Sequence, residues 1–207
     1  MKKCFICGLL PLIVIILSVI LILSCGGGSR SQEFQVVFVA LQMDTDAIDR
    51  FGNTISSSIP ELTINGRSPL FTAMRMGTAI ERGDPQMAMG SAMRFSAMLA
   101  SGEVDLVIVN MQNAMNMAQG SAFLPLEAIF TESELSALEG RLLDFDILRP
   151  NEMDVQVPTG ERTGYLGIDI TGNEQMTAIF GGQQIGVFVI TNTANRDLAI
   201  HLMRSLI

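Results

Sequence analysis

Several chemically reactive residue types are rare in this 207-residue sequence, which has one histidine, one tyrosine and no tryptophan. Its lysines are Lys2 and Lys3, and its cysteines are Cys4, Cys7 and Cys25. After Cys25 the chain therefore has neither a thiol nor a lysine. This excludes a disulfide, a zinc–thiolate site, a cysteine nucleophile, a P-loop lysine and a Schiff-base lysine in that part of the chain.

The single histidine, His201, lies between Ile200 and Leu202 in a C-terminal segment predicted to be helical. One imidazole cannot form a multi-histidine metal site, and no sequence motif marks a serine that it could activate in a Ser-His-Asp triad. We therefore expect His201 to be a partly exposed helix residue, and we expect the protein not to be an enzyme. A small hydrolase that uses carboxylates alone is the weaker alternative.

The N-terminal segment has the pattern of a secretory signal. Lys2 and Lys3 precede an uncharged run that ends at Ser24, and Ile22-Leu23-Ser24-Cys25 resembles the lipobox of bacterial lipoproteins. In that family the signal is cleaved before the cysteine, which then carries the lipid, so the resemblance implies lipidation at Cys25. An uncleaved transmembrane anchor is the alternative, because an apolar run of about 20 residues spans a bilayer.

Cleavage before Cys25 would leave a mature chain of 183 residues that keeps all 21 acidic residues. Of the 13 basic residues the two lysines would be lost, leaving 11 arginines and a net charge of −10. Such a domain is poorly suited to nucleic acid or anionic lipid headgroups. We expect a signal peptide at 1–24, the lipidated cysteine with a flexible linker at 25–33, and one domain at 34–207.

Acid and methionine clusters have structural explanations. Asp44, Asp46 and Asp49 do not match an EF-hand calcium loop, because the further oxygen ligand and the glycine of that loop are missing. Acidic residues at a helix N-terminus instead complement the helix dipole. Asp144 and Asp146 are expected in a solvated loop. Met-x-Met pairs at 74–76, 87–89 and 115–117 are expected to be core or adaptable surface residues rather than Cu(I) ligands. The sequence thus predicts no metal site and no cofactor.

Strand and helix patterns alternate along the domain. Apolar runs predict buried strands at 34–41, 104–109 and 185–191, with shorter strands at 62–64 and 165–170. Caps and helical spacing predict helices at 44–58, 84–101, 113–119, 131–143, 173–180 and 194–206. Residues 67–83 read as an irregular strand and loop. This order predicts an α/β fold, a three-layer arrangement around an open, mostly parallel sheet.

Polar side chains follow the buried strands. Ligands of open α/β sheets bind beyond the carboxyl ends of strands, and amides there can orient a small polar molecule. The alternative for each residue is that it caps a helix or turn. The candidate ligand-binding residues chosen on this ground are Gln42, Asp44, Asn110, Gln112, Asn113 and Asn192.

Three further segments carry a family resemblance. They are Met98–Ile108 (MLASGEVDLVI), Ala122–Leu126 (AFLPL) and Gly186–Thr193 (GVFVITNT). Together with the lipobox they are similar to the extracellular solute-binding lipoproteins of ABC importers, which have the type II periplasmic-binding-protein fold.

That resemblance implies a non-enzymatic receptor on the outer face of the bacterial cytoplasmic membrane or in the periplasm. Its partners would be the membrane, through the lipid anchor, an ABC permease and a small solute. The chain length implies one lobe with a reduced or absent second lobe. Tyr165 is the only tyrosine that could stack on a sugar. An interaction or sensory lipoprotein without a ligand cleft is the alternative.

The lipobox interpretation predicts that a Cys25→Ser variant expressed in bacteria takes up no alkyne-tagged fatty acid, because the lipid is attached to that cysteine. The Cys7→Ser variant is the control, since it removes a thiol within the predicted signal. A Cys25→Ser chain that is processed and membrane-bound like the wild type would contradict lipidation at this position.

Overall fold

The computed structural model describes residues 33–77, 84–151 and 154–207, which belong to the unit Gln32–Ile207. The predicted signal, Cys25 and all but the last residue of the predicted linker lie outside the described residues. Within the described ranges no helix is long and apolar enough to cross a membrane.

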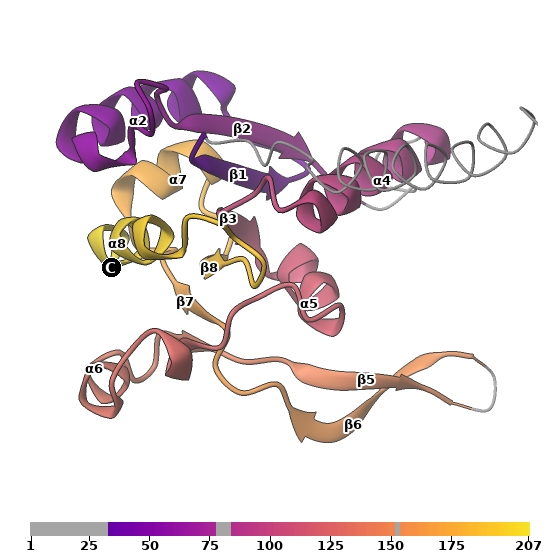
Figure 1. Ribbon diagram of the computed structural model, residues 1–207. Helices are drawn as coiled ribbons and strands as arrows, with labels where there is room; N and C mark the ends of the chain where they lie inside the picture. The colour runs from indigo at the N-terminus through magenta and orange to yellow at the C-terminus, as the bar shows by residue number, and fades with distance from the viewer. Residues whose placement is uncertain (1–32, 78–83, 152–153) are drawn as a thin grey trace, which may run out of the picture. The chain divides into compact units, whose positions relative to one another are not determined.

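A six-stranded sheet forms the middle of the domain, in the order β2-β1-β3-β8-β7-β4 (Figure 1). β1 pairs in parallel with both β2 and β3, while β8, β7 and β4 each run antiparallel to the preceding strand in that order. Four of the six strands therefore point the same way, which confirms the predicted α/β class. The strands are β1 (Gln35–Ala40), β2 (Leu70–Arg75), β3 (Leu106–Asn110), β4 (Leu142–Leu143), β7 (Gly167–Asp169) and β8 (Ile185–Val189).

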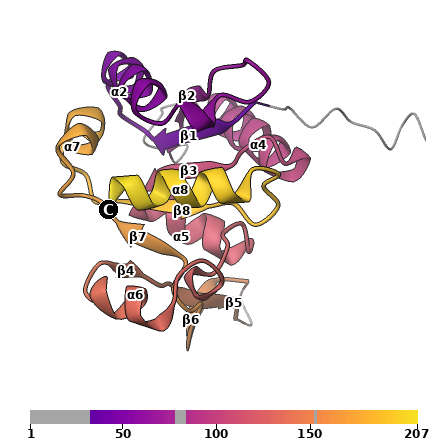
Figure 2. The same ribbon diagram turned by 60° about the vertical axis from the view of Figure 1, so that its left-hand side comes forward.

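Helices cover both faces of this sheet. Side chains from α2 (Thr45–Ser58), α7 (Glu174–Phe180) and α8 (Arg196–Leu206) form one buried cluster with one face. Those from α4 (Pro85–Ser101) and α5 (Met111–Gln119) form a second cluster with the other face. The predicted three layers are therefore present, and Figure 2 shows α8 lying along β8.

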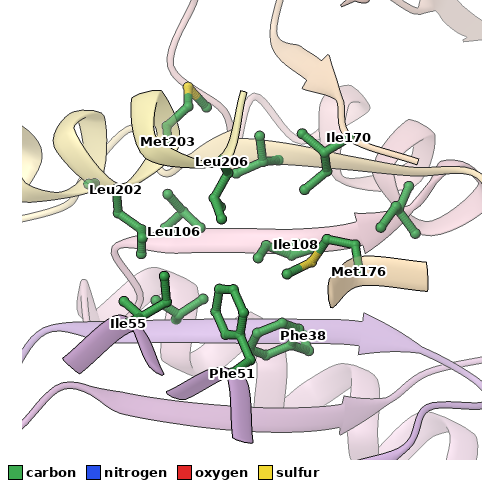
Figure 3. Close-up of a cluster of buried hydrophobic side chains, with 14 of the residues drawn as sticks. Phe38, Phe51, Ile55, Leu106, Ile108, Ile170, Met176, Leu202, Met203 and Leu206 are labelled. Atoms are coloured by element: carbon green, nitrogen blue, oxygen red, sulfur yellow. The ribbon is translucent and has the colours of Figure 1, made fainter. Parts of the chain in front are cut away.

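The central strands are apolar on both sides, as their continuous apolar runs predict. In β1, Phe38 joins the cluster under α2 and α8, and the next residue, Val39, joins the cluster under α4 and α5. Figure 3 shows the first cluster, where Phe38 meets Phe51 of α2 edge-to-face with ring centroids 5.6 Å apart. Burial on both faces fixes which residues point to each helix layer.

Most helices begin at the predicted caps. The Asp84 carboxylate accepts the amide of Gln86 at the start of α4, and Gly102 ends that helix with a left-handed φ of 72°. Thr131 and Glu134 form the predicted capping box of α6 (Glu132–Ala137). The helix predicted there is too long, since α6 ends at Ala137, and Leu142–Leu143 forms β4 instead of continuing the helix.

The strand predicted at 62–64 is wrong, whereas the irregular strand and loop expected at 67–83 contains a strand. Residues Pro60–Leu62 form the 3₁₀ helix η1, and Ile64 makes only an isolated bridge to Arg67 across a tight turn. The second strand of the sheet is instead β2, in the segment whose pattern was unclear. Five of its six residues are exposed or half-buried because it lies at the sheet edge, so its sequence lacks the apolar run of a central strand.

A two-stranded hairpin of β5 (Asp146–Pro150) and β6 (Gln156–Arg162) was not predicted; Figure 1 shows it projecting from the sheet. Arg162 forms ion pairs with Asp144 and Asp146, which were expected in a solvated loop. Every residue of β6 is exposed, so the strand has no core-facing pattern in its sequence. A short 3₁₀ helix, η2 (Leu126–Ala128), precedes α6.

A buried carboxylate links the two central parallel strands to the segment before α8. Asp105, which is 1 % exposed, accepts the backbone amide of Gln35 at 2.8 Å and the hydroxyl of Thr193. It also accepts the side-chain amide of Asn195 at 3.2 Å. Burial raises the pKa of Asp105, and these hydrogen bonds oppose that rise.

The Asp105→Asn variant should lower the free energy of unfolding by about 1–3 kcal/mol, because its amide directs N–H groups at buried donors. The native Asp105 binds its proton at a higher pH than the unfolded chain does. Its contribution to stability therefore grows as the pH falls through the folded pKa towards the unfolded value near 3.8. Urea unfolding at a series of pH values from about 7 down to about 4 should show the wild-type advantage widening on acidification. A constant difference would contradict the raised pKa.

Candidate functional site

The sheet has a topological switch point between β1 and β3. The chain leaves β1 through α2 to reach β2 on one side, and then returns through α4 to β3 on the other side. The segments after β1 and β3 consequently separate, which leaves a crevice beyond the carboxyl ends of these strands. A hollow of about 620 Å³ lies there, called the polar hollow below. Its lining residues are Leu41 to Asp44, Asn110, Gln112, Ala178 to Gly181 and Gln183.

Two helices start at the polar hollow. Asp44 caps α2 by accepting the amide of Ala47 at 2.9 Å, and Asn110 caps α5 by accepting the amide of Asn113 at 3.3 Å. The backbone amide of Asp44 also donates to the carbonyl of Ile179, which joins the segment after β1 to α7. The expectation that these side chains could cap helices is therefore confirmed for both.

A chain of side-chain amides crosses the polar hollow. Asn113 donates to the Asn110 side-chain oxygen at 2.8 Å, and Asn110 donates to the Gln183 side-chain oxygen at 3.5 Å. Gln183 in turn donates to the backbone carbonyls of Phe180 and Gln42, at 2.9 and 3.2 Å. These contacts hold the segments after β1, after β3 and before β8 together at one edge of the sheet.

Other polar groups at the hollow remain open to a ligand. The side chains of Gln42 and Gln112 are exposed and make no hydrogen bond to another described residue. Asp44 is the only ionisable residue among the described residues that line the hollow. Amides both donate and accept, so the hollow suits a neutral polar ligand or one with a cationic group near Asp44. Among the described residues, no cluster of three or more His, Cys, Asp or Glu could hold a metal ion.

Most sequence-predicted ligand residues meet at this site. Gln42, Asp44, Asn110 and Gln112 line the polar hollow together. Asn113 lies beside it and lines a smaller hollow of about 220 Å³ with Asn110 and Gln112. Their proximity follows from the parallel pairing of β1 with β3, which places both carboxyl ends at the same edge.

Asn192 and Tyr165 lie elsewhere. β8 runs antiparallel to β3, so Asn192, which follows β8, lies at the opposite edge and donates to the carbonyl of Leu99 at 2.7 Å. Asn192 is therefore not part of the polar hollow lining, and it lines a separate depression of about 580 Å³ together with Asn113. Tyr165, 40 % exposed, precedes β7 and is not part of the polar hollow lining. Its backbone carbonyl accepts the amide of Leu126.

The sequence reasoning missed the contribution of α7 and of Gln183. Because β8 is antiparallel, the segment that enters it, rather than the one that leaves it, lies beside the carboxyl ends of β1 and β3. The polar run Gly181–Gln184 before an apolar strand could have indicated this part of the site, but only if the direction of the strand had been known.

Comparison of the chain with models of protein families, with curated proteins and with solved structures found no match. The ligand chemistry of the polar hollow is therefore inferred from its lining residues and their geometry.

The two amide residues after β3 should respond differently to substitution. Asn110→Ala should lower the free energy of unfolding by about 1 kcal/mol, because the α5 cap is lost. Gln112→Ala, which removes an exposed side chain with no protein partner, should change it by less than about 0.5 kcal/mol. Urea unfolding of both variants checks this. Equal stability of the Asn110→Ala variant and the wild type would contradict the capping role.

Proposed function

We propose that the protein is a membrane-tethered, extracytoplasmic solute-binding-like lipoprotein, non-enzymatic, that presents a small solute to an ABC permease. The observation that carries this proposal is the polar hollow at the β1/β3 switch point. It is lined by Gln42, Asp44, Asn110 and Gln112, residues that the sequence singles out for ligand binding. Predicted lipidation at Cys25 would hold the domain at the outer membrane face.

The strand arrangement supports a single-lobe form of the family proposed from the sequence. The order β2-β1-β3 with an antiparallel β8 beside β3 gives one open sheet. Among the described residues, the segment between α5 and β7 forms only η2, the short helix α6, β4 and the β5–β6 hairpin. A second lobe with its own sheet would need many more residues in that segment. The ligand would consequently bind to one face rather than between two closing lobes.

A carboxylate-based hydrolase receives less support than binding. Inverting and retaining glycosidases alike require two carboxyl groups beside the reacting bond. The polar hollow has one carboxylate, Asp44, and that group is already used as a helix cap. The alternative of an interaction or sensory lipoprotein without a cleft is less favoured because open amides line a hollow of about 620 Å³.

A thermal-shift screen of residues 25–207 against amino acids, peptides, sugars, polyamines and metal ions tests the proposal. A true ligand at about 100 times its Kd should stabilise the native state by about 2.7 kcal/mol. Gln112→Ala should abolish that shift. Gln86→Ala is a matched control, since Gln86 is also the second residue of an exposed helix start but lies outside the hollow lining.

A screen in which no compound raises the melting temperature would remove the support for a receptor. Equal shifts in the Gln112→Ala and wild-type proteins would place the ligand outside the polar hollow.

A further inference from the structure

The polar hollow continues into two further depressions on the surface. A connecting hollow of about 220 Å³ shares Leu41, Asn110 and Gln112 with the polar hollow. The same connecting hollow shares Met76, Ala92, Asn113 and Asn116 with a groove of about 580 Å³ between α4 and α5, called the α4/α5 groove below. The shared lining residues make the three depressions neighbours on one surface, and this row of depressions is called the path below.

The α4/α5 groove is apolar and carries no charge. Its lining includes Phe95 and Leu99 of α4, Met117 of α5 and Ile190, and none of the described lining residues is ionisable. Next to this face of α4 lie Met89 and Met93, which are 63 % and 64 % exposed. Flexible thioether side chains adapt to apolar groups of varied shape, so the groove suits apolar side chains rather than one rigid ligand.

Uncharged amides are distributed along the same path. Gln42 and Gln112 lie at the polar hollow, and Asn116 lies at the junction with the α4/α5 groove. The side chains of all three make no hydrogen bond to another described residue. Each amide offers a donor and an acceptor, which is also what each peptide group offers. A peptide backbone could therefore pair with them in sequence.

Charge at the path discriminates between ligand classes. Among the described residues, none that lines the three depressions is an arginine or lysine, so these linings offer no cation to pair with a phosphate, sulfate or carboxylate. Phospholipid headgroups and free fatty acids are disfavoured for that reason. Among the described lining residues the one ionisable group is Asp44, which lines the polar hollow and not the α4/α5 groove, and its carboxylate favours an ammonium group.

We propose that the ligand is a short peptide with an apolar residue. Its N-terminal ammonium lies at Asp44, its backbone follows the exposed amides, and its apolar side chain occupies the α4/α5 groove. This assignment rests on the proposed function, because it names the solute class of the same site.

The probe is the peptide amide Ala-Gly-Ala-Leu-Phe-NH₂, and its binding to residues 25–207 is measured by isothermal titration calorimetry. Ala92→Trp fills the groove and should weaken binding at least about tenfold. Ala97→Trp is the matched control, because Ala97 is an exposed alanine of the same helix outside the groove lining, and its affinity should stay within about twofold of wild type.

The ammonium contact is tested with the N-acetylated peptide and with Asp44→Asn, which keeps a good helix cap but removes the charge. Each change should weaken binding about fivefold. The two changes together should weaken binding no more than either one alone, because both remove the same interaction.

Failure of the probe to bind the wild type, or equal affinities of the wild-type and Ala92→Trp proteins, would overturn the peptide assignment. If the thermal-shift screen then finds a solute that depends on Gln112 but not on Ala92, the receptor proposal stands and the peptide assignment alone fails. If no solute depends on Gln112, both fail.

Discussion

The buried carboxylate of Asp105 is the contact on which the alignment of the central strands depends. It lies just before β3, binds the backbone amide at the start of β1 and receives side-chain hydrogen bonds from Thr193 and Asn195 after β8. One carboxylate thus accepts hydrogen bonds from the buried donors of Gln35, Thr193 and Asn195. Without it, these donors would be buried away from water with no hydrogen-bond partner. Fixing the amino ends of β1 and β3 also fixes where their carboxyl ends stop.

The candidate site follows from that alignment. Parallel β1 and β3, held in register, release the chain at the same edge, where Asp44 and Asn110 each begin a helix. Because no lysine or arginine is among the described residues that line the polar hollow, these residues can recognise a ligand through amides and one carboxylate. The apolar groove beyond it exists because α4 buries just Phe95 and Met98, which leaves much of this helix exposed.

The sequence predicts helix caps and buried strands correctly, because these features depend on residues close together in the chain. A cap such as Asp44 bonds to an amide three residues away, and a strand buried on both faces needs an apolar run, so both are visible in sequence. β2 was foreseen only as an irregular strand without bounds, and the β5–β6 hairpin was not foreseen, because edge and exposed strands need no such run. Four of the candidate residues share one hollow, whereas Asn192 does not, since strand direction is set by distant pairing.

The sequence by itself determined the α/β class, the helix caps, the buried strands and the acidic, lysine-free composition of the chain after Cys25, because each depends on residue type and near neighbours. Only the tertiary structure decided that β8 is antiparallel, that Gln183 rather than Asn192 completes the amide chain, and that an apolar groove adjoins the polar hollow. These features arise from contacts between residues far apart in the chain, such as the hydrogen bond from Asn110 to Gln183, and no local pattern encodes them.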